Sequence, residues 1–85
     1  MASSAKGQVS RLSAHTDATY LQLESEQSDL PKNGYFVLKL DNQNYNALYS
    51  LALAAAVNRL TLNIKTVEEI MPTDFATVDY LLIIW

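Results

Sequence analysis

The side chains that could act as general acids, general bases or metal ligands are few and scattered. His15 is the single histidine, and the only acid at ligand spacing from it is Asp17, so a site built on imidazole lacks the carboxylates it would need. A second acidic group comes late in the chain and comprises Glu68, Glu69, Asp74 and Asp79. It lacks the glycine-punctuated alternation of acidic ligands found in calcium loops. We therefore interpret it as a solvated loop, and His15 as a turn residue.

Motifs for nucleophilic catalysis and for phosphate binding find no support either. No serine lies in a G-x-S-x-G elbow. The chain of 85 residues has two glycines, far apart, which excludes a phosphate-cradling loop. The absence of cysteine excludes disulfides and thiolate metal sites. We predict that the protein is not an enzyme and takes no cofactor and no metal.

Aromatic side chains offer the remaining chemistry. Tyr20 and Tyr35 fall on the outward faces of two neighbouring predicted strands, where they could stack on sugars or bases. A cross-strand aromatic pair that stabilises a bare sheet is the favoured interpretation, and a ligand site is the alternative. Tyr45 and Tyr49 stand four residues apart on an apolar helix, a spacing more typical of core or interface packing than of a stacking platform.

Charge and hydropathy narrow the classes of partner. The formal net charge is -3 and the six basic residues are scattered singly, whereas phosphate backbones are held by clustered positive charge, so we expect no nucleic-acid partner. The longest apolar run, Leu51–Val57, is far too short to span a bilayer, so we expect no membrane insertion. The start MASSAKGQVS lacks the apolar core of a signal peptide. Localisation stays open: cytoplasmic for the chain as written, secreted if a leader was removed.

The elements that must position these side chains follow from periodicity and turn chemistry. Apolar alternation predicts strands at Gly7–His15, Ala18–Glu24, Tyr35–Leu40, Leu60–Thr66 and Thr77–Trp85. An uncharged, alanine-rich stretch predicts a helix over Asn42–Arg59. Asp41, Asn42 or Asn44 could cap its start, and Asn58 suits the left-handed residue that ends it.

The predicted order is β-β-β-α-β-β, which is mainly β with one central helix and matches the five-stranded Greek-key barrel of the OB-fold. We expect a disordered tail over residues 1–6 and a single OB-fold-like domain over residues 7–85. Val9 and Leu12 are three residues apart, so they share a face only if a bulge intervenes. The side chains expected to fill the barrel are Leu21, Leu23, Phe36, Leu38, Leu40, Leu62, Ile64, Tyr80 and Leu82.

The helix carries the prediction of self-association. No charged residue lies between Asp41 and Arg59, whereas a surface helix normally shows one charged face. We interpret the helix as buried on two sides, against its own barrel and against another subunit. The last strand, apolar on both faces, adds a second contact. The predicted oligomer interface comprises Tyr45, Tyr49, Ala52, Leu53, Ala56, Leu81, Ile83 and Trp85.

A resemblance to a known family is found in the helix and its flanking strands, over Tyr35–Trp85. Its residues are Asp41, Tyr45, Leu48, Tyr49, Leu51, Ala52, Ala55 and the pair Asn58-Arg59, followed by a strand, then Tyr80 and the apolar end LLIIW. This pattern resembles the B-subunit-like domains of bacterial AB5 toxins of the pertussis and subtilase-cytotoxin kind. The resemblance implies an OB-fold, a homopentameric ring with helices around a pore, and glycan binding. Those subunits generally carry a disulfide, which this chain lacks, and no glycan-contact residue can be matched.

Three hypotheses follow from the sequence. The first is a non-enzymatic OB-fold protein that forms a homo-oligomeric ring, most simply a pentamer, and binds glycan or protein at exposed loops. The second is a single-stranded nucleic-acid-binding module that stacks bases on Tyr20 and Tyr35, against which the net negative charge argues. The third is a small adaptor that docks a larger protein through the helix.

Overall fold

The computed structural model describes residues 3–25 and 30–83, and within them strands dominate and one helix stands alone. The elements in order are β1 (Ser4–Ala14), β2 (Ala18–Glu24), a 3-10 turn η1 (Lys32–Gly34), β3 (Tyr35–Lys39), α1 (Tyr45–Val57), β4 (Leu62–Thr66) and β5 (Ala76–Ile83). This confirms the predicted mainly β chain with a single central helix.

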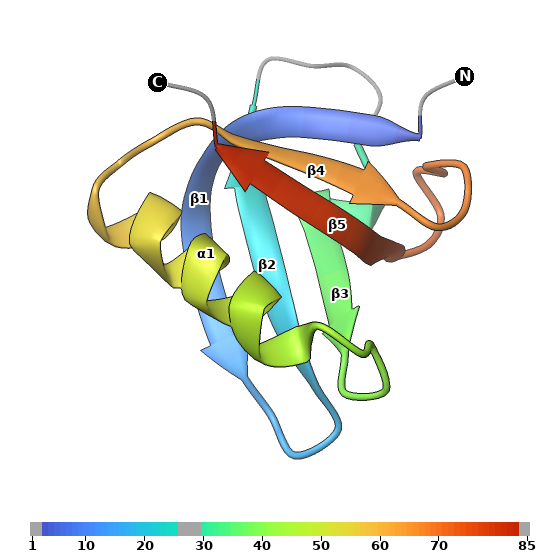
Figure 1. Cartoon of the computed structure of the whole chain (residues 1–85). Coiled ribbons are helices and arrows are strands. Elements are labelled where there is room, and N and C mark those ends of the chain that lie inside the picture. The colour runs from blue at the N-terminus through green and yellow to red at the C-terminus, as the bar shows by residue number, and fades with distance from the viewer. Residues whose placement is uncertain (1–2, 26–29, 84–85) are drawn as a thin grey trace.

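Strand β1 is long and bends so that it serves two neighbours (Figure 1). Its first residues, Ser4 to Gly7, pair with β4, and the residues from Gln8 onward pair with β2. Glycine is required at the bend, because a Cβ on Gly7 would lie 2.6 Å from the backbone oxygen of Glu24. The predicted tail is therefore wrong from Ser4 to Lys6, while residues 1–2 lie outside the described part.

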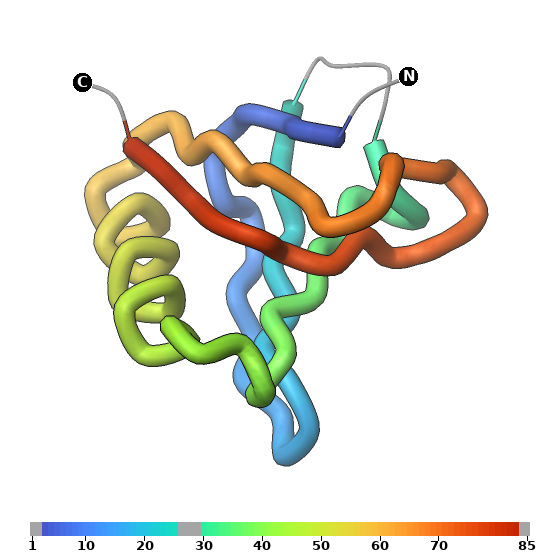
Figure 2. The backbone as a smooth tube through the Cα atoms, turned by 45° about the vertical axis from the view of Figure 1, so that its right-hand side comes forward, coloured from blue at the N-terminus to red at the C-terminus, as the bar shows by residue number. Residues whose placement is uncertain are grey.

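The five strands form one closed ring of ladders. Their order is β1-β2-β3-β5-β4, and β4 returns to β1 (Figure 2). Neighbouring strands pair antiparallel except β3 and β5, which run parallel and share only the pairs Phe36–Ala76 and Val37–Thr77. Helix α1 packs against β1, β3 and β5. Because the described strands close into a ring, the apolar strand β5 is paired on both sides. An apolar strand at an open sheet edge would be prone to aggregation.

A bulge in β1 decides which of its side chains face outward. Val9 pairs with Leu23 and Arg11 with Gln22, so Ser10 is the extra residue. Val9 and Leu12 consequently both pack against the core, which the three-residue spacing allows only because this bulge intervenes.

A second bulge, in β5, overturns part of the predicted core. Val78 pairs with Thr66 and Tyr80 with Lys65, so Asp79 is the extra residue and the faces exchange after it. Tyr80 and Leu82, expected inside, are 49% and 36% exposed. Leu81, expected at a subunit interface, is 7% exposed and lies in the core.

The rest of the barrel filling agrees with the alternation pattern. The predicted inward residues that are buried are Leu21, Leu23, Phe36, Leu38, Leu62 and Ile64. Leu40 is the remaining exception, at 49% exposed, because β3 ends at Lys39 and the chain turns there through the bond from the Asn42 N–H to the Lys39 carbonyl.

The helix is shorter than predicted at both ends. Asn44 is its N-cap residue, and the Asn42 side chain accepts a hydrogen bond of 2.9 Å from the Asn44 N–H. At the other end Arg59, not Asn58, is left-handed, with φ 56°. The Leu60 N–H bonds the Ala55 carbonyl and the Arg59 N–H bonds the Ala56 carbonyl, which together form a Schellman cap.

Candidate functional site

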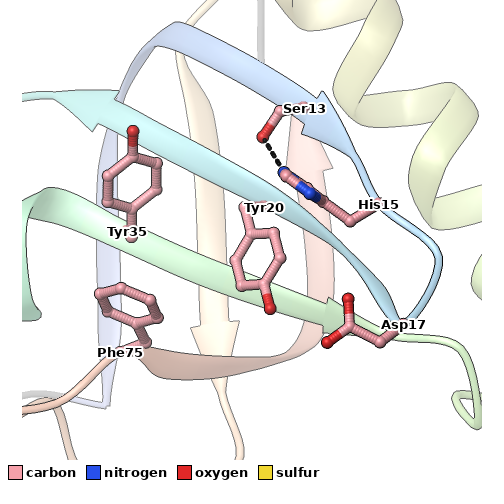
Figure 3. Close-up of a pocket in the computed structure, with 6 residues that line it drawn as sticks. All are labelled: Ser13, His15, Asp17, Tyr20, Tyr35 and Phe75. Atoms are coloured by element: carbon pink, nitrogen blue, oxygen red, sulfur yellow. Dashed lines mark hydrogen bonds between the residues drawn. The ribbon is translucent and has the colours of Figure 1, made fainter.

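Three aromatic rings converge on the outer face of the β1-β2-β3 sheet (Figure 3). Tyr20 stands on β2, Tyr35 begins β3, and Phe75 comes from the loop that leads into β5. The ring of Phe75 lies 5.6 Å from that of Tyr35 and 6.2 Å from that of Tyr20. His15, just after β1, packs edge-on against Tyr20 with ring centres 5.1 Å apart. We call Tyr20, Tyr35, Phe75 and His15 the aromatic cluster.

The strand register explains why polar groups join this cluster. Cross-strand partners share a face, so Ser13, Tyr20 and Val37 form one outward row. Arg11, Gln22 and Tyr35 form the next row, and the Arg11 Nη1 donates to the Tyr35 hydroxyl at 3.4 Å.

The bulge at Ser10 therefore shapes the fold and also places two polar side chains at the site. Without the extra residue, Arg11 and Ser13 would point into the barrel, since side chains alternate along a strand.

Backbone hydrogen bonds hold Phe75 over the sheet. The Lys32 N–H bonds the Asp74 carbonyl at 2.9 Å, which ties the loop before β5 to the turn before β3. The Thr77 N–H donates to the Glu68 carboxylate at 2.5 Å. Glu68 is exposed, as expected for a solvated acid, and its carboxylate also anchors the start of β5 at Thr77, two residues after Phe75.

These side chains surround an open cavity of about 400 Å³ on the surface, lined by Ser13, His15, Asp17, Tyr20, Tyr35 and Phe75. A cavity of this size that is mostly apolar, with a few polar groups around it, is typical of small-ligand sites. Both predicted ligand-binding residues, Tyr20 and Tyr35, line it. The aromatic walls would contact the flat faces of a ligand, and the hydroxyls, imidazole and carboxylate would hydrogen-bond its rim.

The cavity also contains a serine, a histidine and an aspartate, but not as a catalytic relay. His15 Nε2 lies 3.2 Å from the Ser13 hydroxyl. A relay needs an acid on the other ring nitrogen. The Asp17 carboxylate instead lies toward the hydroxyl end of Tyr20, apart from the Ser13–His15 pair (Figure 3).

Other constellations in the described residues offer no stronger chemistry. Ser3 and Lys6 have the S-x-x-K spacing, but the Ser3 hydroxyl accepts a hydrogen bond from the Lys65 ammonium at 2.7 Å. Within residues 3–25 and 30–83 no three histidine, cysteine, aspartate or glutamate side chains are grouped to hold a metal ion. In the same part of the chain, no helix has the length and apolarity to cross a membrane.

The predicted interface residues are distributed in three ways. Ala52 is completely buried and Leu81 nearly so, both within the chain's own core, so their assignment to a subunit interface is wrong. Tyr45, Tyr49, Ala56 and Ile83 are partly buried, and Leu53 is 42% exposed. Trp85 lies outside the described residues.

The helix still presents an uncharged surface away from the barrel. Its exposed residues, which we call the outer helix face, are Asn46, Ala47, Ser50, Leu53, Ala54 and Val57. Tyr45 and Tyr49, by contrast, stack on each other at 6.4 Å, and the Tyr45 hydroxyl bonds the buried Thr19 hydroxyl. These two tyrosines therefore pack within the chain itself and do not form an exposed surface on which a ligand could stack.

Sequence reasoning missed Phe75, Ser13 and Asp17 as parts of the site. Phe75 follows Pro72 in a loop whose direction no periodic pattern indicates. Asp17 and His15 lie in the β1–β2 turn, and their spacing of two residues does not indicate that both line one cavity with aromatic side chains. The available signal was the outward position of Ser13, which becomes visible once the bulge at Ser10 is placed.

The fold and site thus define a small β protein with an aromatic-lined cavity on one face of its sheet. No protein-family model matches the chain, and neither a curated protein nor a solved structure matches it significantly.

Proposed function

We propose that the protein is a non-enzymatic OB-fold protein that binds neutral glycans on the aromatic cluster. The observation that carries the proposal is the convergence of Tyr20, Tyr35 and Phe75 from three separate segments around one cavity. OB-folds bind oligosaccharides and oligonucleotides on the corresponding sheet face, and glycan binding is also what the toxin B-subunit resemblance implies.

The chemistry of the cavity suits a sugar. The faces of aromatic rings are electron-rich, so they attract the polarised C–H groups on the flat side of a pyranose. The Asp17 carboxylate can accept hydrogen bonds from sugar hydroxyls, and the Ser13 hydroxyl can donate or accept them.

Charge favours a sugar over the nucleic-acid alternative. A phosphate backbone needs several clustered lysines or arginines. Arg11 bonds the Tyr35 hydroxyl from outside the cavity, and the side chains that line the cavity include the acidic Asp17 but no lysine or arginine.

The test is a printed array of neutral and anionic glycans, with oligothymidylate included. We expect the wild type to bind neutral glycans and Phe75→Ala or Tyr35→Ala to lose about tenfold in affinity. Tyr80→Ala is the matched control, because Tyr80 is 49% exposed on β5 and outside the cluster. No binding to any neutral glycan, or equal loss in the control, would contradict the proposal.

Absence of catalysis is part of the proposal and has its own readout. Neutral oligosaccharides incubated with the protein should keep their masses in a mass spectrum. Shortened products that vanish in His15→Ala or Asp17→Ala would make the protein a hydrolase instead.

Self-association is the second proposed property, with a homopentameric ring as its form. It rests on the outer helix face, where Leu53 and Val57 are 42% and 72% exposed and no charged residue lies along the whole helix. A ring lets complementary patches on each subunit cover one another without leaving an open filament. The third hypothesis, an adaptor docked through the same helix, differs in requiring another protein to cover it.

A further inference from the structure

The cavity of the aromatic cluster does not stand alone, since two further hollows adjoin it. One, of about 420 Å³, is lined by Asp17, Ala18, Tyr20, Val37, Lys39, Leu40 and Asp41. The other, of about 320 Å³, is lined by Lys32, Thr73, Asp74 and Phe75. Tyr20 and Asp17 are common to the first hollow and the cluster cavity, and Phe75 is common to the second and the cluster cavity.

The three hollows lie side by side with shared side chains at their borders, and we call this row of hollows along β3 the groove. Its middle lies at Tyr35 and Tyr20, one end at Lys32 before the strand, and the other end at Leu40 just after it. Tyr35 and Lys39 are four residues apart on an extended strand, which is roughly 13 Å. The groove is therefore longer than a single sugar ring.

Resting on the proposed function, we infer that this groove binds a chain of several neutral sugars laid along β3, rather than one terminal sugar. Two exposed apolar side chains support the inference. Phe75 is 43% and Leu40 49% exposed, and each lines one of the hollows along the groove. Both would contact a ligand that continues past the central cavity.

The charges along the groove favour a neutral chain. Asp17, Asp41 and Asp74 are interspersed with Lys32 and Lys39. A polyanion is bound by clustered lysines and arginines, and these lining residues contain no such cluster. Alternating acids and bases instead supply acceptors and donors for hydroxyl groups spaced along a chain.

An extended peptide fits less well. Peptides that lie along a sheet usually add a strand to a free edge, and the described strands close into a ring. The groove lies on a sheet face, where only side chains meet the ligand, and flat rings with hydroxyl rims match aromatic walls and carboxylates better than a peptide backbone does.

The experiment measures affinity by calorimetry for cello-, malto- and chito-oligosaccharides, from single sugars to hexasaccharides. In at least one series we expect affinity to rise with each added sugar until the groove is filled, then to level off. Tyr20→Ala should weaken every length. Leu40→Ala and Lys32→Ala, at opposite ends, should weaken hexasaccharides about tenfold and leave single sugars unchanged. Circular dichroism establishes that each variant is folded.

Each failure has a distinct meaning. Single sugars that bind as tightly as hexasaccharides, or end variants that weaken all lengths equally, overturn the extended groove and leave the glycan-binding function intact. No binding by any member of these three series, when neutral glycans do bind on the array, overturns the groove alone, and no binding in either experiment overturns the proposed function as well. Tighter binding of oligothymidylate, falling steeply with salt, assigns the groove to single-stranded nucleic acid and overturns the inference.

Discussion

At the scale of single residues, two positions allow sharp tests of stability. One has a strained backbone conformation, and the other has a buried hydroxyl that is bonded to one other side chain. Arg59 ends the helix in a left-handed conformation, at a place where glycine is usual. Thr19 is fully buried, and its hydroxyl depends on the hydroxyl of Tyr45.

Arg59→Gly should stabilise the protein. The left-handed conformation costs an L-residue about 1–2 kcal/mol, and the extra freedom of unfolded glycine offsets about 0.4–1 kcal/mol of the gain. We expect a net gain of roughly 0.5 kcal/mol in the free energy of unfolding, measured by urea denaturation. Asn58→Gly is the control, since Asn58 has φ -94° and its amide donates to the Ala54 carbonyl at 2.8 Å, so glycine there should destabilise.

Tyr45→Phe should destabilise the protein by about 1–3 kcal/mol, because it leaves the buried Thr19 hydroxyl without its partner. Thermal unfolding followed by circular dichroism measures the change. Tyr80→Phe removes a hydroxyl from an exposed tyrosine and should be neutral. Equal effects of the two variants would show that the bond to Thr19 contributes nothing.

At the scale of elements, the alternation of apolar residues predicted where the strands lie. The bulges in β1 and β5 determine which side chains of those two strands face the core. Strands β2, β3 and β4 keep one phase, so their inward residues, such as Leu21, Leu38 and Ile64, could be assigned from sequence. One extra residue in β5, Asp79, reverses the phase and leaves no mark in the pattern, because Tyr80, Leu81 and Leu82 are all apolar enough for either face. The bulge in β1 could be predicted, since Val9 and Leu12 are out of phase.

The same limit applies to the site. Tyr20 and Tyr35 could be found from strand phase alone. Phe75 could not, because it is placed by the bond between Lys32 and Asp74, a contact between distant loops that local sequence does not encode.

The β5 bulge makes a paired prediction. Leu81→Ala should cost about 2–5 kcal/mol in stability, the usual cost of truncating a core leucine, whereas Leu82→Ala should cost less than about 0.5 kcal/mol. Chemical denaturation of the two variants measures both. The reverse ranking would mean that β5 continues in one phase through Asp79.

At the scale of the whole molecule, the apolar surplus lies on surfaces rather than in an enlarged core. Of the exposed large apolar side chains, Leu40 and Phe75 belong to the groove and Leu53 and Val57 to the outer helix face. Tyr80 and Leu82 lie beside each other on β5, next to Lys65 and Asn63 of β4. Under the proposed function and assembly, the groove and the outer helix face are the apolar surfaces that other molecules would cover.

Leu53→Asp should dissolve the proposed ring. We expect native mass spectrometry of the wild type to show a multiple of the 9.5 kDa chain, and the variant to show the single chain, still folded by circular dichroism because Leu53 is 42% exposed. Gln43→Asp, exposed just before the helix, is the charge-matched control and should stay assembled. A wild type that is monomeric at every concentration ends the assembly proposal.

The two-sided pairing of β1 also sets an order of events during folding. Residues Ser4 to Gly7 pair with Lys65 to Leu62 of β4, which lie 55 to 61 residues later in the chain. Such distant pairing slows closure relative to the β1–β2 hairpin, which needs only a short turn. During synthesis on the ribosome, the partners of the β1–β2 hairpin therefore emerge early, whereas the pairing of Ser4–Gly7 with β4 has to wait until Leu62–Lys65 has been made.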